Sequence, residues 1–161
     1  TLSNVTNYTV GDVIELEHIY YDFDKADIRR DATIDLDKLA NILQRYPAMT
    51  IELSSHTDAR AVDVYNLDLS QRRAQAAIEY LVAKGIGRSR LVPKGYGETQ
   101  PRNHCVDGIK CSELEHQRNR RTEIRVLTTQ SNVDVRYIDN EPEYIDIPGQ
   151  NISPTLPQGN E

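Results

Sequence analysis

An alternating apolar segment followed directly by a helical pattern restricts the fold of this chain more than any other feature. Within residues 49–54 every second side chain is apolar, which is typical of a β-strand with one buried face. Apolar residues at helical spacing then predict a helix that begins between positions 63 and 70 and ends at Gly85. The expected core residues of that helix are Leu67, Ala74, Ile78 and Leu81. A strand that leads into such a helix favours an α/β layered fold.

Further segments complete the predicted order of elements. Strand patterns occur at residues 14–23, 91–96 and 121–128. A helix is expected over residues 31–46, with Asp31 as its N-cap and Pro47 at its end. The order strand, helix, strand, helix, strand, loop, strand predicts an α/β (βαβαββ) sandwich, in which helices pack on one face of a small mixed four-stranded sheet.

Length and composition favour one globular domain with flanking segments. The chain has 161 residues, 38% of them hydrophobic, which suffices for one core. We expect a lead-in at residues 1–13, the domain at residues 14–128, and an irregular, proline-rich and acidic tail at residues 129–161. The net charge of -6 argues against a nucleic-acid partner. No apolar run is long enough to span a membrane.

Two charged side chains lie where a ligand site could form. Asp58 directly follows the strand, and Arg73 lies on the helix that packs back over it. The carboxylate can accept an ammonium group and the guanidinium can hold a carboxylate by two parallel hydrogen bonds, so the pair can bind a zwitterion. Each residue also has a plainer interpretation, Asp58 as a turn or capping carboxylate and Arg73 as a solvated helix residue. Arg72 is the better candidate for the solvated position.

The motif around these two residues resembles that of a known family. The order T-D-x-x-x-x-x-x-Y-N-x-x-L-S-x-x-R-A, at residues 57–74, is similar to the signature of the OmpA-like C-terminal domain. Further family-like stretches occur, in the family's order, at residues 19–28, 85–98 and 119–124. The resemblance therefore extends over residues 14–128. It departs from the family at Ser55 and Ala61, where glycine is common, so the turn after the strand can be shaped differently.

The resemblance implies that the domain binds peptidoglycan by holding the diaminopimelate side chain of the stem peptide. Asp58 would take the ammonium group and Arg73 the carboxylate of meso-diaminopimelate, whereas lysine would leave the guanidinium without a partner. The other ligand-binding positions implied by the resemblance are Asp22, Phe23, Asp24, Thr57, Asn66, Leu69 and Arg120. Asn66 can also serve as a helix-start amide and Asp24 as a turn residue. Arg121 is expected to point elsewhere, because neighbouring strand residues face opposite ways.

Cys105 and Cys111 are the only cysteines of the chain and lie in a polar loop. In an oxidising periplasm they would form a disulfide. Alternatively, four zinc ligands could be supplied by His104, Cys105, Cys111 and His116. The lack of a C-x-x-C pair favours the disulfide and no metal. Cysteines in this loop also resemble Bacteroidota versions of the domain, which occur at the end of larger envelope lipoproteins, including a type IX secretion component.

The leading hypothesis is a non-catalytic binding module, without a cofactor, at the periplasmic face of the outer membrane of a Gram-negative bacterium. It would anchor an outer-membrane protein or complex to the cell wall, and its other envelope partners would bind through domains outside this chain. The alternative is a protein-interaction module of an envelope complex with a degenerate wall-binding pocket, which Ala61 and the tail favour. His56 is not accompanied by a nucleophile motif, an H-E-x-x-H sequence or a phosphate loop, so we do not expect an enzyme.

Overall fold

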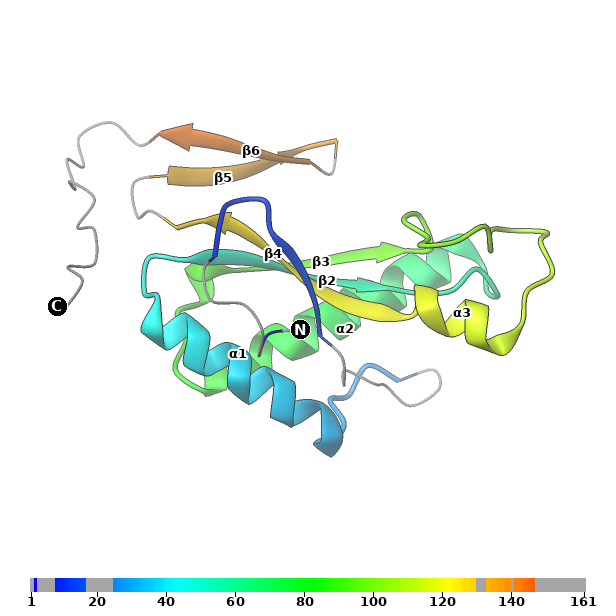
Figure 1. The fold of residues 1–161 in the computed structure, drawn as a ribbon, viewed down its shortest axis with the longest axis horizontal. Helices are drawn as coiled ribbons and strands as arrows, with labels where there is room; N and C mark the ends of the chain where they lie inside the picture. Colours follow the sequence, from blue (N-terminus) through cyan, green and yellow to red (C-terminus); the bar gives the residue numbers. More distant parts are fainter. Residues whose placement is uncertain (1, 3–7, 17–24, 130–132, 140, 147–161) are drawn as a thin grey trace, which may run out of the picture.

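A mixed sheet of four strands forms the centre of the protein, which a computed structural model describes over residues 2, 8–16, 25–129, 133–139 and 141–146 (Figure 1). The strands are β1 (Val13–Leu16), β2 (Thr50–His56), β3 (Leu91–Gly97) and β4 (Arg121–Thr128). Their order is β1-β4-β2-β3, with β4 antiparallel to both of its neighbours and β2 parallel to β3. The predicted sandwich with a small mixed sheet is therefore confirmed. The remainder of the expected first strand, at residues 17–24, lies outside the described residues.

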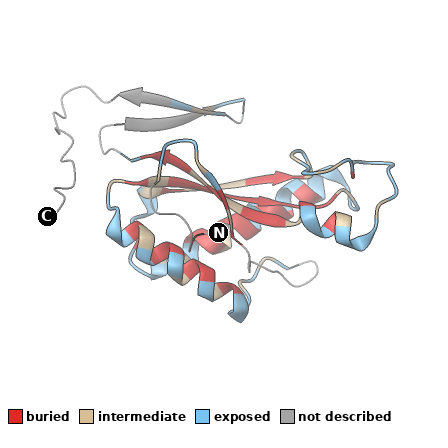
Figure 2. Cartoon of the chain, in the orientation of Figure 1, coloured by how far each residue is buried: buried red, intermediate tan, exposed pale blue. Residues whose placement is uncertain are grey.

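Helices α1 (Thr33–Arg45) and α2 (Asp63–Ala83) pack on one face of this sheet (Figure 1). The buried stripes of both helices and the inward side chains of β2 and β4 form the core, which is red in Figure 2. Its wholly buried large side chains include Leu36, Leu39, Leu43, Met49, Ile51, Leu53, Ile78, Leu81, Ile124 and Val126. Replacing one such leucine by alanine typically costs about 2–5 kcal/mol of stability, so these contacts fix the layer arrangement.

Helix α2 begins at Asp63, within the predicted range, but the cap of α1 and one expected core residue of α2 differ from the sequence prediction. A 3-10 turn at Arg30–Ala32 precedes α1, so Asp31 lies inside that turn and does not cap the helix. Its carboxylate pairs with Arg29 at 3.1 Å. On α2, Leu67 is 50% exposed and does not belong to the core face. At this turn β3 approaches the backbone of α2 and not the Leu67 side chain. Gly97 lies so close that a Cβ atom added to it would be 3.0 Å from the Leu67 backbone nitrogen.

The close approach of α2 to β3 depends on glycine. A Cβ atom on Gly95 would lie 2.3 Å from the backbone nitrogen of Gln71, which is closer than any side chain can come. The Gly95 N–H donates to Gln71 Oε1 at 2.7 Å, and the Gly97 N–H donates to Ser70 Oγ at 2.9 Å. Because helix and strand touch through their backbones, the end of β3 lies beside the first turns of α2.

The outer face of the sheet is also covered, whereas the alternating pattern predicted one buried face for β2. Glu52, in the middle of β2, is 1% exposed. Its carboxylate oxygens accept hydrogen bonds from Tyr96 Oη at 2.9 Å and from Tyr137 Oη. Burial and the neighbouring Glu52 raise the pKa of both tyrosines, which therefore remain protonated donors.

Tyr137 belongs to a β-hairpin in the segment that was expected to be irregular. The hairpin consists of β5 (Val133–Ile138) and β6 (Glu141–Asp146), which pair in antiparallel register (Figure 1). The prediction of an irregular tail is therefore wrong for these residues. The hairpin covers the polar outer face of the sheet through Tyr137, far along the chain from the carboxylate that it contacts.

A short third helix, α3 (Glu113–Asn119), lies in the connection between β3 and β4, where we expected a loop. A capping box starts it: Ser112 Oγ accepts from the Glu115 N–H at 3.3 Å, and the Ser112 N–H donates to Glu115 Oε2 at 2.8 Å. Within the described part of the chain, no helix combines the length and the apolar character that crossing a bilayer requires.

Candidate ligand-binding site

A charged cavity of about 600 Å³ opens where β2 ends and α2 begins. It is bounded by the end of β2, the loop that follows, the first half of α2, α3 and the start of β4. The lining residues are Arg29, Ser55, His56, Thr57, Asp58, Arg60, Ala61, Tyr65, Asn66, Leu69, Arg73, Glu113, Gln117, Arg120, Arg121 and Thr122.

Six of the nine positions expected to contact a ligand line this one cavity. They are Thr57, Asp58, Asn66, Leu69, Arg73 and Arg120. The other three, Asp22, Phe23 and Asp24, lie outside the described residues. The fold therefore brings together residues from the loop after β2, from α2 and from the junction of α3 with β4, which are far apart in the sequence.

Four charged side chains form a closed hydrogen-bonded ring, the charge ring, among the lining residues of the cavity. Asp58 Oδ2 accepts from Arg60 Nη2 at 2.8 Å and from Arg120 Nη1 at 2.6 Å. Glu113 accepts from the same two guanidinium groups, at Oε2 from Arg60 Nη1 (2.7 Å) and at Oε1 from Arg120 Nη2 (2.5 Å). The two positive and two negative charges cancel. The Asp58 side chain is 11% exposed, whereas that of Glu113 is 64% exposed.

Asp58 is ionised throughout the physiological pH range. Burial of its carboxylate opposes ionisation, but hydrogen bonds from Arg60 and Arg120 outweigh burial and lower the pKa of Asp58 to about 2. An ionised carboxylate accepts about four hydrogen bonds. Oδ2 accepts the two guanidinium contacts, and Oδ1 accepts the Arg60 backbone N–H at 3.1 Å. Among the contacts of the described residues, this leaves an acceptor position on Oδ1.

Arg73 brings a second buried charge to the cavity from α2. It is 8% exposed, and its Nε donates to the backbone oxygen of Lys25 at 3.0 Å, which fixes the direction of the guanidinium. Its neighbour Arg72 has a half-exposed side chain and pairs with Asp68 on the same helix at 2.8 Å. The two arginines therefore differ as predicted: Arg73 lines the cavity, and Arg72 lies on the exposed surface of α2.

Asn66 holds the loop that carries Asp58. Its Nδ2 lies within hydrogen-bond distance of the backbone oxygens of Asp58 (3.2 Å) and Ala61 (3.3 Å) and of Glu98 Oε1 (3.1 Å). These contacts assign Asn66 the structural role of a helix-start amide in the unliganded protein. A direct contact with a ligand stays a prediction.

Two buried hydroxyl groups at the cavity lack a hydrogen-bond partner among the described residues. They belong to Thr57, on the loop after β2, and to Thr122, on β4. A buried polar group without a partner costs about 1–3 kcal/mol, so such groups are uncommon unless a ligand or water completes them. Leu69, which is 5% exposed, adds an apolar contact to the same lining. The cavity therefore offers charged, polar and apolar contacts together.

Sequence reasoning missed Arg60, Glu113 and Thr122. The role of Arg60 could have been predicted, because an arginine two residues after Asp58 in a tight loop can reach that carboxylate. The role of Glu113 could not have been predicted in the same way, because Glu113 reaches the cavity through α3, which was not predicted. Arg121, expected to point elsewhere, does line the cavity, but its guanidinium is bound to Glu123 Oε1 (2.6 Å) and to the Gln100 backbone oxygen (2.8 Å).

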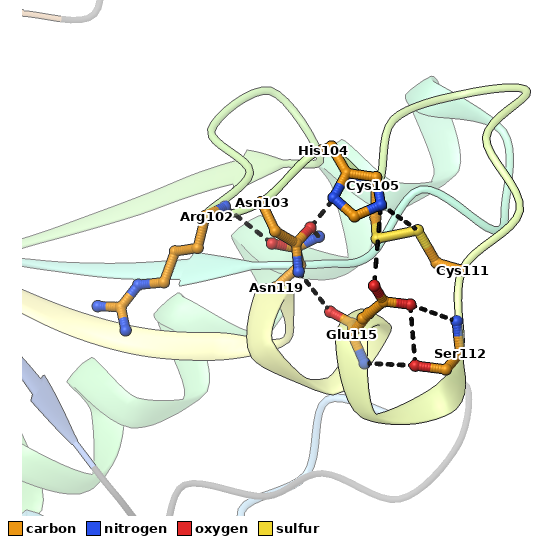
Figure 3. The surroundings of a disulfide bond; sticks show 8 residues. All are labelled: Arg102, Asn103, His104, Cys105, Cys111, Ser112, Glu115 and Asn119. Carbon is orange, nitrogen blue, oxygen red and sulfur yellow. Dashed lines mark hydrogen bonds and ion pairs between the residues drawn. A yellow bond between two sulfur atoms is a disulfide. The ribbon is translucent and has the colours of Figure 1, made fainter.

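The expected disulfide between Cys105 and Cys111 is present at the start of α3 (Figure 3). Its Cα atoms lie 6.0 Å apart, and both sulfur atoms are used in the bond, so the alternative zinc set with His104 and His116 is not formed. Asn103 ties the same loop to α3, because its Nδ2 donates to the Glu115 backbone oxygen at 2.8 Å. The loop thereby holds the helix that presents Glu113 to the charge ring.

His56 is a buried neutral base on the outer face of β2. Its ring stacks on Tyr96 with centroids 5.2 Å apart, and Nε2 lies 3.2 Å from Ser54 Oγ. Burial, reinforced by the positive charge of Arg121, lowers the pKa of His56 to about 4. The imidazole is therefore uncharged at neutral pH and contributes packing on the sheet.

The fold and the cavity define a class of protein: a small α/β binding domain with a charged site at the end of its central strand. The sequence profile of the OmpA family matches residues 20–113. The chain belongs to the OmpA family.

Relatives with about 40% identity cover most of the domain. Peptidoglycan-associated lipoprotein of Rhizobium meliloti is 39% identical over 95 residues, which are 59% of this chain and 53% of that protein. Outer membrane porin F of Pseudomonas fluorescens is 39% identical over 93 residues (57% and 28%). Photosystem I P700 chlorophyll a apoprotein A2 of Gloeobacter violaceus is 40% identical over 114 residues (70% and 13%). The chain spans about half of these relatives or less.

Solved structures show the same fold. The peptidoglycan-associated lipoprotein of Burkholderia pseudomallei superposes with a TM-score of 0.56 at 26% identity, covering 68% of this chain and 86% of that one. The cell wall anchor of the T6SS of Pseudomonas aeruginosa gives a TM-score of 0.60 at 26% identity, covering 71% and 80%. These structures confirm the mixed α/β arrangement.

Proposed function

We propose that this domain binds peptidoglycan by holding the meso-diaminopimelate of the stem peptide, and that it thereby anchors an outer-membrane protein or complex to the cell wall. The observation that carries the proposal is that the buried, oppositely charged Asp58 and Arg73 line one cavity. The names of the relatives, peptidoglycan-associated lipoprotein and cell wall anchor, support the wall as the target. Together with outer membrane porin F, they support the periplasmic face of the outer membrane as its location.

The zwitterionic end of meso-diaminopimelate matches these two charges. Its ammonium group donates to Asp58 Oδ1, the oxygen that accepts only a backbone N–H among the described contacts. Its carboxylate is received by the guanidinium of Arg73, which lines the same cavity. Both contacts join full charges in a partly desolvated cavity, where such hydrogen bonds are stronger than neutral ones. The unpaired hydroxyls of Thr57 and Thr122 offer further hydrogen bonds to the polar atoms of the peptide.

The chemistry of the lining supports binding without catalysis. The residues at the cavity pair charges with one another, and His56, the base beside the motif, lies stacked on Tyr96. Within a longer protein, such a domain acts as the module that holds the wall. The Bacteroidota-type cysteine loop favours a parent among the larger envelope lipoproteins, such as a type IX secretion component.

Sedimentation with purified sacculi tests the proposal. The protein should sediment with walls that contain meso-diaminopimelate, and free meso-diaminopimelate should release it. Walls with lysine at the same position serve as the matched control and should retain much less protein. Failure to sediment with either wall would favour the alternative of a protein-interaction module, and release of soluble muropeptides would favour a hydrolase.

A further inference from the structure

We infer that Arg60 and Arg120 form a second anion-binding subsite of the charged cavity, which Glu113 occupies until a ligand carboxylate displaces it. The inference rests on the proposed function, because the ligand must first be held at Asp58 and Arg73. It adds to that function a place for a second carboxylate of the peptide, and it makes Glu113 a competitor of the ligand.

The two guanidinium groups are held in place before any ligand binds. Each donates one N–H to Asp58 Oδ2 and another to Glu113, so that both are directed at the same two carboxylates. Asp58 is buried and sits on a loop that Asn66 fixes. The arginines therefore present a preorganised pair of donors to whatever carboxylate lies opposite Asp58.

Glu113 is the exchangeable member of the charge ring. Its side chain is 64% exposed, compared with 11% for Asp58, and Glu113 is the first residue of α3. Exposed ion pairs contribute little to stability, because water and salt screen them. Arg120 lowers the pKa of Glu113, so the side chain is ionised at neutral pH and occupies the subsite as an anion. A carboxylate on a bound peptide can replace it with the same geometry and charge.

Charge balance indicates which ligands will displace Glu113. The ring is neutral while Glu113 is in place, and moving that carboxylate into water leaves one uncompensated positive charge on the arginines. A ligand that offers only its zwitterionic end satisfies Asp58 and Arg73 and does not restore the balance. A peptide with a further free carboxylate within reach does restore it. The stem peptide L-alanyl-γ-D-glutamyl-meso-diaminopimelate has such carboxylates.

Calorimetry with two forms of this tripeptide tests the inference. One form has its carboxylates free; in the other, every carboxylate outside the zwitterionic end is amidated. Because Glu113→Gln removes the competing anion, it should bind the free form about twofold to fivefold more tightly than the unmodified protein does, a gain in the range of an exposed ion pair. The gain should be confined to the free form. Arg60→Gln should weaken binding of the free form more than that of the amidated form.

Asp68→Asn is the matched control. The Asp68 side chain is also 64% exposed and pairs with an arginine, but it does not line the cavity, and the change in net charge is the same. It should leave both affinities unchanged. An unchanged or weaker affinity in Glu113→Gln, or an equal gain for the amidated peptide, would overturn the subsite while leaving the proposed function intact. Failure of the unmodified protein to bind either peptide would overturn both.

Discussion

Arg120 Nη1 donates a hydrogen bond to Asp58 Oδ2 at 2.6 Å and so joins the end of α3 to the loop after β2, across 62 positions of the chain. The contact gives Asp58 two functions. It fixes the loop that forms one wall of the charged cavity, and it keeps the carboxylate ionised for a ligand. Changes at this residue therefore need a variant that keeps the size and planar shape of the side chain while it removes the charge, and Asp58→Asn meets that need.

Asp58→Asn and Arg73→Ala should each remove most binding to sacculi. Loss of one member of a desolvated charged contact costs about 2–5 kcal/mol, which is roughly 30-fold or more in affinity. Arg72→Ala is the control, because this exposed neighbour pairs with Asp68 and does not line the cavity. Sedimentation assays and thermal unfolding, measured side by side, separate lost binding from lost folding. Equal damage from the Arg72 variant would show that the faces of α2 are wrongly assigned.

Lysine-containing stem peptides should bind about 100-fold or more weakly than those with meso-diaminopimelate. With lysine, the ammonium group still reaches Asp58, but the ligand brings no carboxylate to Arg73, and sites built around a polar group of the ligand reject analogues that lack it. Calorimetry with matched peptides measures the ratio. Similar affinities for the two peptides would mean that Arg73 does not recognise the carboxylate.

Stability should fall as the pH is lowered from about 6.5 to 4, because of His56. The pKa of this residue is about 4 in the folded protein, against an ordinary histidine value of 6.5. Between these values the unfolded chain binds a proton that the folded protein does not, so acid favours unfolding, by on the order of 3 kcal/mol in total. Urea unfolding at pH 7, 5.5 and 4 should show a smaller decrease for His56→Gln. Parallel decreases in both proteins would contradict the prediction.

Gly95→Ala should strongly destabilise the fold. The added Cβ would meet the backbone of Gln71 at 2.3 Å, and neither helix α2 nor strand β3 can move away without disturbing the core. Gly87→Ala is the matched control, because the nearest atom to its added Cβ is 4.0 Å away on the side chain of Arg90. The expected losses in the free energy of unfolding are about 3 kcal/mol or more for Gly95→Ala and below about 1 kcal/mol for Gly87→Ala.

Reduction of the disulfide should loosen α3 and leave the core folded. Cys105 and Cys111 are six positions apart, and a short ring removes little entropy from the unfolded chain. Hydrogen exchange after reduction should accelerate at α3 and remain slow at α2. Alkylation without reductant should leave the intact mass unchanged. Two reactive thiols, or zinc retained in native mass spectrometry, would contradict the disulfide in solution.

Local sequence patterns predicted most of the helices and strands, because the spacing of apolar residues within each segment was sufficient to identify it. Strand β4 was predicted with its observed bounds, and Arg73 was distinguished from Arg72 by the family-like motif that contains it. Helix α3 was not predicted, because it has only seven residues and no clear apolar stripe. Elements of that length have too few positions for a periodicity to be recognised.

Features that depend on distant residues could not be predicted. Glu52 occupied a polar position of an alternating strand, which indicated solvent, yet Tyr96 and Tyr137 bury it. Glu113 joins the charge ring because the fold brings α3 to the end of β2. In both cases the decisive partner lies far away in sequence, and no short motif records the pairing.

The hairpin β5–β6 contacts the sheet through a polar group, the Glu52 carboxylate. This contact determines what becomes exposed if the hairpin detaches. Thr50, Glu52, Ser54 and His56 alternate onto the outer face of β2, and the Glu52 carboxylate loses one of its two tyrosine donors once Tyr137 leaves. Detachment of β5 and β6 would therefore open a charged carboxylate of the sheet to water. The described core cluster between the helices and the sheet contains no residue of β5 or β6, so its contacts would stay in place if the hairpin left.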